Sequence, residues 1–171
     1  NIADQDSEWG VPVHDETTVF ELLTLEGAQA GLSWMTILRK RENYKKAFDS
    51  YNVEKISIYG PAKISSLIVN NGIIRNKLKI NSTVQNAKAF LKVQKEFGSF
   101  DKYTWQFVGN KPIKNSFKNL SDYPIKTEIS IIISKDLLKR EFKFVGPTIC
   151  YAFMQATGLA NDHQVQCFRE K

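Results

Sequence analysis

Cysteine is scarce in this sequence, and long apolar runs are missing. Its 171 residues include two cysteines, Cys150 inside an apolar stretch and Cys167 near the end. Their spacing gives no sign of a disulfide framework, so we expect a protein of the cytoplasm. No segment approaches the roughly 18 apolar residues that a membrane-spanning helix needs, and the first residues lack the basic-then-apolar order of a secretory signal. We therefore expect no membrane partner.

The charge balance favours a polyanionic partner without requiring one. The chain has 24 Lys and Arg against 18 Asp and Glu, which gives a formal net charge of +6. Nucleic acids attract such proteins, although many basic proteins bind nothing acidic. The length is that of one ordinary domain with a sizeable core, so we interpret residues 1–171 as a single domain.

Apolar residues recur at intervals of three and four along most of the chain, and this spacing predicts an all-α fold. The expected helices cover about 15–30, 33–48, 80–98, 131–138 and 147–158, with shorter ones after residues 53, 61 and 99. Asp15, Ser33 and Ser99 are suited to cap helix N-termini, and Gly31 separates the first two helices. No pair of segments alternates with period two, and the polar segment 109–123 is predicted to be a surface loop.

The segment 142–148, Phe-Lys-Phe-Val-Gly-Pro-Thr, joins two predicted helices in the pattern of a helix-hairpin-helix. Gly146 has no Cβ, so its backbone can approach a phosphate, and the N–H groups at the start of the next helix attract an anion. The residues expected to contact DNA here are Lys143, Val145, Gly146 and Thr148. An ordinary tight connection between helices has the same spacing, so the pattern alone leaves both interpretations open.

A second turn leads into a helix at residues 72–79, where Arg75, Lys77 and Lys79 are basic. Arg75 is a candidate phosphate contact. A solvated helix face accounts for the same cluster, because charged residues gather routinely on helix surfaces.

Six motifs of this chain together resemble the 3-methyladenine DNA glycosylase I family in order and spacing. They are Glu8-Trp9-Gly10-Val11-Pro12, Leu25-Glu26-Gly27-Ala28-Gln29-Ala30-Gly31-Leu32-Ser33-Trp34, Arg41-Glu42-Asn43-Tyr44, Gly72-Ile73-Ile74-Arg75, Phe142-Lys143-Phe144-Val145-Gly146 and Asn161-Asp162-His163. A collinear series over nearly the whole chain is far more specific than any single motif. The resemblance implies a compact all-α domain of the helix-hairpin-helix DNA glycosylase type, which excises 3-methyladenine from duplex DNA in base excision repair.

The resemblance also implies roles for two residues. Glu26 is the pocket carboxylate on which catalysis depends, and Trp34 stacks on the flipped base. Methylation at N3 makes adenine cationic and weakens its glycosidic bond, so the enzyme mainly flips, holds and stabilises the base. The charge of Glu26 favours a cationic base, and cation–π attraction to Trp34 adds about 0.5–2 kcal/mol. Such chemistry requires no cofactor, and a monomer is sufficient for it.

The residues taken by themselves leave other roles open. Glu26 lies among leucines, where a functional carboxylate and an incidental one fit equally well. Trp34 at helical spacing is more typical of a packed core. Asp162 lies near the place where related glycosylases carry a catalytic aspartate, and a role in a turn or cap fits it at least as well.

The N-terminal segment departs from the family pattern. Members typically carry Tyr-His-Asp shortly before Glu-Trp-Gly, whereas this chain has Asp4-Gln5-Asp6 before Glu8-Trp9-Gly10. Asp4 stands where the family aims a tyrosine at the base, and with Trp9 it is assigned to substrate binding. The new carboxylate either strengthens the attraction for a cationic base or reflects a different placement of this segment.

Gln5 replaces the histidine that family members contribute to a structural zinc site. His163 and Cys167 keep an H-x-x-x-C half-site, whose spacing puts both side chains on one face of a helical turn. Two ligands are too few and glutamine is a poor zinc ligand, so we regard a bound zinc as doubtful unless upstream residues complete the site. Capping or packing by His163, and a thiol of no consequence at Cys167, are the alternatives.

The sequence thus carries three functional hypotheses. The first is a monofunctional glycosylase, because the pocket motif contains no lysine that could form a Schiff base. The second is a protein that binds DNA lesions without excising a base. The third is a glycosylase for another charged purine adduct. Release of a base from methylated DNA, followed by identification of the product, separates all three.

Overall fold

The computed structural model describes residues 12–29, 31–117 and 126–164. The α-helices are α2 (Glu16–Gln29), α3 (Trp34–Arg39), α4 (Arg41–Ala47), α5 (Val53–Ser57), α6 (Pro61–Ile68), α7 (Lys77–Phe97), α8 (Phe100–Trp105), α9 (Glu128–Lys139) and α10 (Pro147–Thr157). Two 3-10 turns, η1 (Asp49–Tyr51) and η2 (Gln106–Val108), and two strands, β1 (Ile113–Phe117) and β2 (Ala160–Gln164), complete the described elements. The predicted all-α fold class is confirmed, with one small exception in the two strands.

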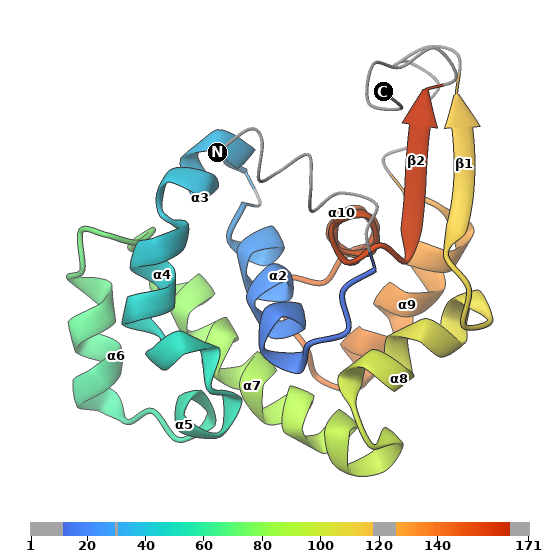
Figure 1. The fold of residues 1–171 in the computed structure, drawn as a ribbon. Coiled ribbons are helices and arrows are strands. Elements are labelled where there is room, and N and C mark those ends of the chain that lie inside the picture. The colour runs from blue at the N-terminus through green and yellow to red at the C-terminus, as the bar shows by residue number, and fades with distance from the viewer. Residues whose placement is uncertain (1–11, 30, 118–125, 165–171) are drawn as a thin grey trace.

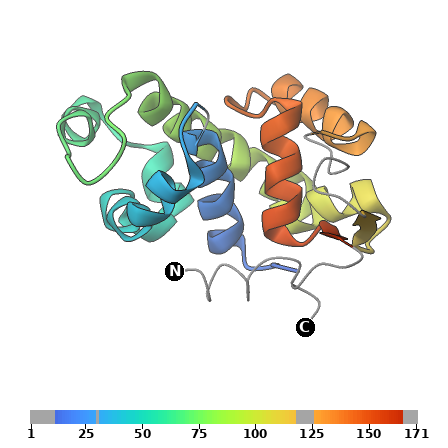
Figure 2. The same ribbon diagram turned by 90° about the horizontal axis from the view of Figure 1, so that it is seen from above.

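The helices form two groups with α2 and α7 between them. Helices α3 to α6 lie on one side, while α8 to α10 and the strands lie on the other, as two perpendicular views agree (Figures 1 and 2). Aromatic rings fill the interior where α2, α7 and α8 meet: the Phe20 and Phe90 ring centroids are 5.1 Å apart, and those of Phe90 and Phe100 are 4.5 Å apart. This packing holds α2, which carries Glu26, from several directions.

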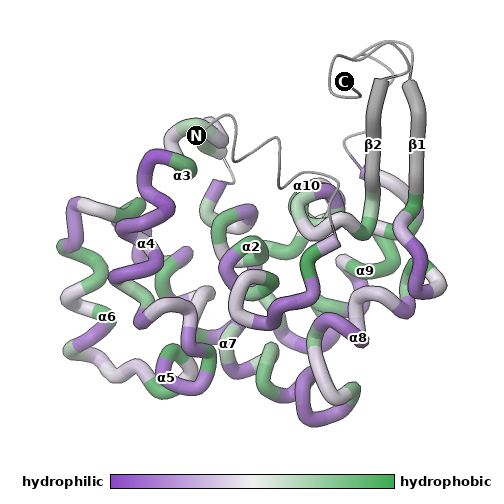
Figure 3. The backbone as a smooth tube through the Cα atoms, viewed as in Figure 1, coloured by the Kyte–Doolittle hydropathy of each residue, from purple (hydrophilic) through white to green (hydrophobic). Residues whose placement is uncertain are grey.

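Most charged residues lie at the surface, and Glu21 and Glu26 of α2 are the buried exceptions among the described residues. Helix α4 is mostly hydrophilic along its length (Figure 3), and only Tyr44 and Ala47 of it are buried. Arg41 of α4 reaches α2, where its Nε lies 3.0 Å from the buried carboxylate of Glu21. None of the described helices is both long and apolar enough to cross a membrane.

The predicted helix caps are confirmed, whereas one predicted helix is divided. The Asp15 carboxylate accepts the Thr18 N–H at 2.9 Å before α2. Ser33 and Ser99 accept backbone N–H groups at the starts of α3 and α8. The helix expected over 33–48 is interrupted at Lys40, whose N–H bonds to a carbonyl three residues back and so tightens the turn between α3 and α4.

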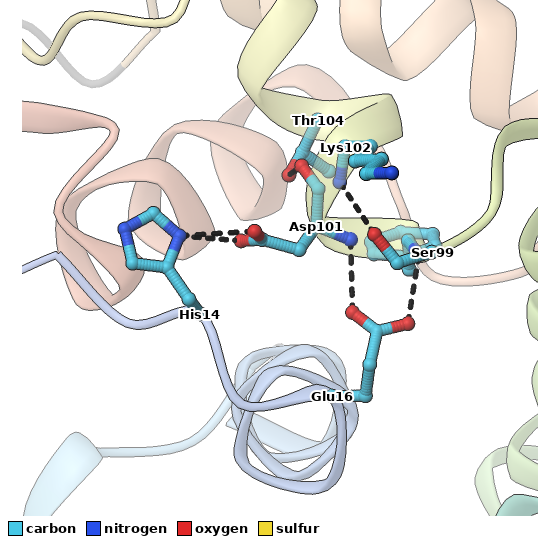
Figure 4. Close-up of polar contacts among 7 residues, drawn as sticks. His14, Glu16, Ser99, Asp101, Lys102 and Thr104 are labelled. Carbon is cyan, nitrogen blue, oxygen red and sulfur yellow. Dashed lines mark hydrogen bonds and ion pairs between the residues drawn. The ribbon is translucent and has the colours of Figure 1, made fainter.

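The start of α2 is tied to the start of α8 (Figure 4). The Glu16 carboxylate accepts the backbone N–H groups of Phe100 at 2.7 Å and Asp101 at 2.9 Å. The Asp101 side chain in turn pairs with the His14 ring, whose Nδ1 lies 2.9 Å from Oδ2. Because helix N-termini have unsatisfied N–H donors and a positive dipole, a carboxylate there is stabilising. The chain just before α2 is therefore fixed against α8.

Strands β1 and β2 pair in parallel, with Ile113 opposite Ala160. The pair corrects the prediction that the chain has no strands and that 109–123 is all loop. The Ile113 N–H donates to the Leu159 carbonyl at 2.8 Å, so pairing begins where α10 has just ended. Neither segment alternates between apolar and polar residues, so the sequence pattern does not reveal the strands. They form through backbone hydrogen bonds between segments that are distant in the chain.

Candidate base pocket and DNA interface

Glu26 lies in the last two turns of α2, and its side chain is removed from water. Only 2% of the residue is exposed. In the part of the chain that the structure describes, no hydrogen bond or ion pair reaches its carboxylate. Burial therefore raises its pKa to about 8, because a charge without partners is costly in a low-dielectric interior. A strongly perturbed carboxyl group of this kind is a mark of functional sites, and it fits the role predicted for Glu26.

The break after α2 is built around Gly31. Its φ is +81°, a left-handed conformation that strains residues with a Cβ, and no atom lies within 4 Å of where a Cβ would be. Across the break, the Leu32 N–H donates to the Gln29 carbonyl at 2.7 Å, and the Gln29 side chain donates to the Leu32 carbonyl at 2.9 Å. The predicted interruption between α2 and α3 is confirmed, and the two helices contact each other.

Trp34 is the first residue of α3, directly after the Ser33 cap. Its ring is half-buried against the core, and its indole Nε1 is sealed from water without a hydrogen-bond partner among the described residues. Both interpretations of the sequence are thus met in part: the indole packs on the core and also keeps some exposed surface. That the Trp34 ring and the Glu26 carboxylate face each other stays a prediction.

Residues 140–146 join α9 to α10 in a tight hairpin, as the sequence predicts. Lys143 and Thr148 are exposed, and an added Cβ on Gly146 would meet no atom within 4 Å. Val145 as a whole residue is only 1% exposed, so the structure leaves almost no surface for the contact with DNA predicted for it. Pro147 is the first residue of α10, which confirms its predicted position at the start of that helix.

Side chains of α9 and α10 bind one backbone carbonyl of the hairpin. The Val145 carbonyl accepts bonds from the Ser134 hydroxyl at 2.7 Å and the Cys150 thiol at 3.2 Å. Burial raises the pKa of that thiol to about 12, so Cys150 is an inert packing residue in keeping with its predicted apolar setting. The Val145 carbonyl is therefore bonded within the protein and does not face an approaching anion.

Arg75 lies on the second candidate phosphate site. It is exposed, and it comes just before Asn76, whose side chain accepts the Lys79 N–H at 3.1 Å and caps α7. The turn that the sequence predicts before it is confirmed, since the Gly72 N–H bonds to the Asn70 side chain at 2.7 Å. Arg75 thus precedes α7 and does not belong to a solvated helix face, and the phosphate contact stays a prediction.

The remaining predicted site residues lie at the ends of the chain. Asp4, Gln5, Trp9 and Cys167 fall outside the described residues. The backbone of His163 belongs to β2, so the prediction that His163 and Cys167 share a helical turn is wrong: an extended chain replaces the helix there. Among the residues that the structure describes, no three His, Cys, Asp or Glu side chains converge in a way that could hold a metal ion.

Two contacts of α7 were not anticipated from the sequence. Lys79 bonds to the end of α2, and Asn86 bonds to the hairpin backbone. The sequence places Lys79 in a cluster of basic residues expected at the surface, and Asn86 belongs to no motif. Only a contact between segments distant in the chain identifies either residue.

Residues 1–170 match the methyladenine glycosylase family. The chain is 46% identical over 162 residues to a DNA-3-methyladenine glycosylase of Haemophilus influenzae, which covers 95% of this chain and 88% of the relative. It is 45% identical over 166 residues to DNA-3-methyladenine glycosylase 1 of Escherichia coli, covering 97% and 89%.

Solved structures agree with these sequence relatives. A structure described as the basis of 3-methyladenine recognition by 3-methyladenine DNA glycosylase I from Staphylococcus aureus matches with a TM-score of 0.95. It is 34% identical, and the match covers 99% of this chain and 90% of the other. The chain therefore belongs to the methyladenine glycosylase family, and the resemblance read from its motifs is confirmed.

Proposed function

We propose that this protein is a monofunctional DNA glycosylase that excises 3-methyladenine, a cationic alkylated purine, in base excision repair. The observation that carries the proposal is the buried carboxyl group of Glu26, whose pKa is raised to about 8 and which has no partner among the described residues. Relatives named for this activity, at 45 and 46% identity over nearly the whole chain, support the same assignment.

Selection for a positive base follows from the burial of Glu26. Without a ligand, most Glu26 side chains are neutral at pH 7, because the pKa is about 8. A cationic base beside the carboxyl group lowers that pKa, so the proton leaves and an ion pair forms in a dry site. Neutral adenine supplies no such charge. The free energy of the ion pair, which offsets the cost of ionising buried Glu26, is thus available to the alkylated base alone.

Trp34 contributes the second part of the selection. An indole face attracts a flipped cationic ring through its negative quadrupole, and stacking on an aromatic side chain is worth about 1–3 kcal/mol per base. Because alkylation has already weakened the glycosidic bond, holding the base while positive charge moves to the sugar is sufficient. The motif 25–34 contains no lysine, so water is the nucleophile and the DNA strand is not cut. Water adds to the sugar carbon and loses a proton to solvent, while the bond to the base breaks and its electron pair neutralises the departing base. This chemistry needs no cofactor.

The DNA is held by the hairpin, with a contribution from the turn before α7. Exposed Lys143 and Thr148, the open backbone at Gly146 and the N-terminus of α10 form a phosphate grip that does not read sequence. Arg75 adds a second contact. Such a grip suits an enzyme that searches all duplex DNA, and one copy of the chain contains every part of the proposed machinery.

Base release from methylated duplex DNA tests the proposal. We expect the protein to release 3-methyladenine and leave an uncut abasic strand, and we expect Glu26→Gln and Trp34→Ala to lower kcat/KM by at least about a hundredfold, the scale of losing a transition-state contact. Glu54→Gln, at an exposed position on α5, is the matched control and should behave as the wild type. Binding to methylated DNA without release of any base would instead identify a lesion-binding protein, and release of a different purine would identify another substrate.

A further inference from the structure

One face of α7 contacts both parts of the proposed machinery. Lys79, Thr83 and Asn86 are four and three residues apart, so they lie in a row along the helix. All three line one cleft, together with Gly27 of α2 and Phe144 of the hairpin. The cleft lies where the three elements meet, and α7 contacts both the helix that carries Glu26 and the hairpin proposed to hold DNA.

Lys79 is bound to the end of α2. Its Nζ donates to the Ala28 carbonyl at 2.8 Å, across 51 positions of sequence. The last turn of α2 contains no basic residue of its own, so the cation that complements its negative end comes from α7. Partial burial lowers the pKa of Lys79, which indicates that the ammonium group is held in the protein and not extended into water.

Asn86 is bound to the backbone of the hairpin in two directions. Its Oδ1 accepts the Lys143 N–H at 2.7 Å, and its Nδ2 donates to the Lys143 carbonyl at 3.0 Å. The side chain is buried, with 7% exposed. Two bonds to one residue fix both the position and the orientation of the peptide, as a neighbouring strand would. Phe144, the next residue, has a φ of +56° and depends on such support to keep its strained conformation.

We infer that Lys79 and Asn86 are positioning residues that set the separation between the base pocket and the DNA-gripping hairpin. The inference rests on the proposed function, since it assigns both contacts to the placement of a flipped base in the pocket. The seven residues of helix from Lys79 to Asn86 span about 10 Å along the axis. Because the helix is rigid, the bonds of these two side chains keep α2 and the hairpin at a fixed separation. A nucleotide whose phosphate is held by the hairpin must place its base beside Glu26, and displacement by about 1 Å can cost a hundredfold in rate.

The test compares two variants with matched controls on the same helix. Asn86→Asp keeps the size of the side chain and removes the donor to the Lys143 carbonyl, while Asn81→Asp adds the same charge at an exposed position. Lys79→Met removes the cation at the end of α2, while Lys88→Met removes a charge from the exposed opposite side of α7. Each variant is measured for binding of methylated duplex DNA, for binding of free 3-methyladenine by tryptophan fluorescence, and for kcat and KM.

We expect the two variants to fail in different ways. Asn86→Asp should weaken duplex binding and raise KM about tenfold relative to Asn81→Asp while it leaves binding of the free base unchanged. Lys79→Met should weaken binding of the free base and lower kcat about tenfold relative to Lys88→Met, and Lys79→Arg should restore most of both.

Other outcomes overturn the inference. If each variant matches its control in duplex binding, free-base binding, kcat and KM per folded molecule, the contacts serve stability alone. A wild type that binds both ligands and releases no base would refute the proposed function, while the two binding measurements would still decide the positioning roles. A wild type that binds neither ligand would refute both.

Discussion

Gly27 of α2 packs directly against Phe144 of the hairpin. A Cβ built on Gly27 would lie 3.4 Å from the Phe144 Cβ and 3.6 Å from the Phe144 carbonyl oxygen. Gly27 follows Glu26 in the chain, and Phe144 follows Lys143, so the pocket and the hairpin are adjacent through this contact. The absence of a side chain at Gly27 allows the two to approach.

A size series at Gly27 should reveal that contact. Gly27→Ala places its methyl group at ordinary contact distance and gains about 1 kcal/mol of helix propensity, so we expect stability equal to or above that of the wild type. Gly27→Val adds methyl groups that displace Phe144, and we expect weaker duplex binding with a loss of about 1–3 kcal/mol in stability. Denaturant unfolding and DNA titration measure both effects. Equal DNA affinity for all three proteins would contradict the importance of this contact.

Glu26 should make the fold less stable as pH rises. Its folded pKa of about 8 lies above the ordinary glutamate value of 4.5, so the unfolded chain loses its proton first and the native state is penalised between those pH values. The full penalty is on the order of 5 kcal/mol. We therefore expect Glu26→Gln to be more stable relative to the wild type at pH 9 than at pH 4. Urea unfolding at the two pH values tests this, and a pH-independent difference would show that the carboxyl group is not held neutral.

The same group should control the pH dependence of catalysis. A cationic base is bound by ionised Glu26, so kcat/KM should rise with pH toward a plateau above pH 8 in the free enzyme. In Glu26→Gln this rise should be absent from whatever activity remains. A wild-type profile that is flat between pH 6 and pH 9 would separate Glu26 from the proposed charge selection.

Gly31 should matter for the site and not only for stability. Gly31→Ala forces a φ of +81° on a residue with a Cβ, which costs about 1–2 kcal/mol, while no neighbouring atom opposes the methyl group. Gly109→Ala is a matched control, because Gly109 has a φ of +65° and equally open surroundings in a distant turn. We expect similar losses in melting temperature for both, but a lower kcat/KM per folded molecule only for Gly31→Ala. Equal kcat/KM would argue against a role of the break in placing Trp34.

Much of the site can be predicted from interactions between residues that are close in the sequence. Asp15, Ser33 and Ser99 cap helices because their side chains bond to N–H groups only a few positions away. Gly31 separates α2 from α3 because glycine adopts the left-handed backbone conformation at little energetic cost. The burial of Glu26 could not be predicted from the sequence, because a carboxylate among leucines can be either exposed on the opposite face of the helix or enclosed in the core.

The rest depends on segments that meet only in the folded chain. The pairing of β1 with β2, the bond from Lys79 to Ala28 and the clamp of Asn86 on Lys143 each join residues more than 40 positions apart. No local sequence pattern predicts these contacts, because the residues come close to each other only when the rest of the chain has folded. The sequence by itself determined most of the helices, several of their caps and the family. Tertiary structure alone decided the raised pKa of Glu26, because it follows from desolvation by neighbours gathered from several helices.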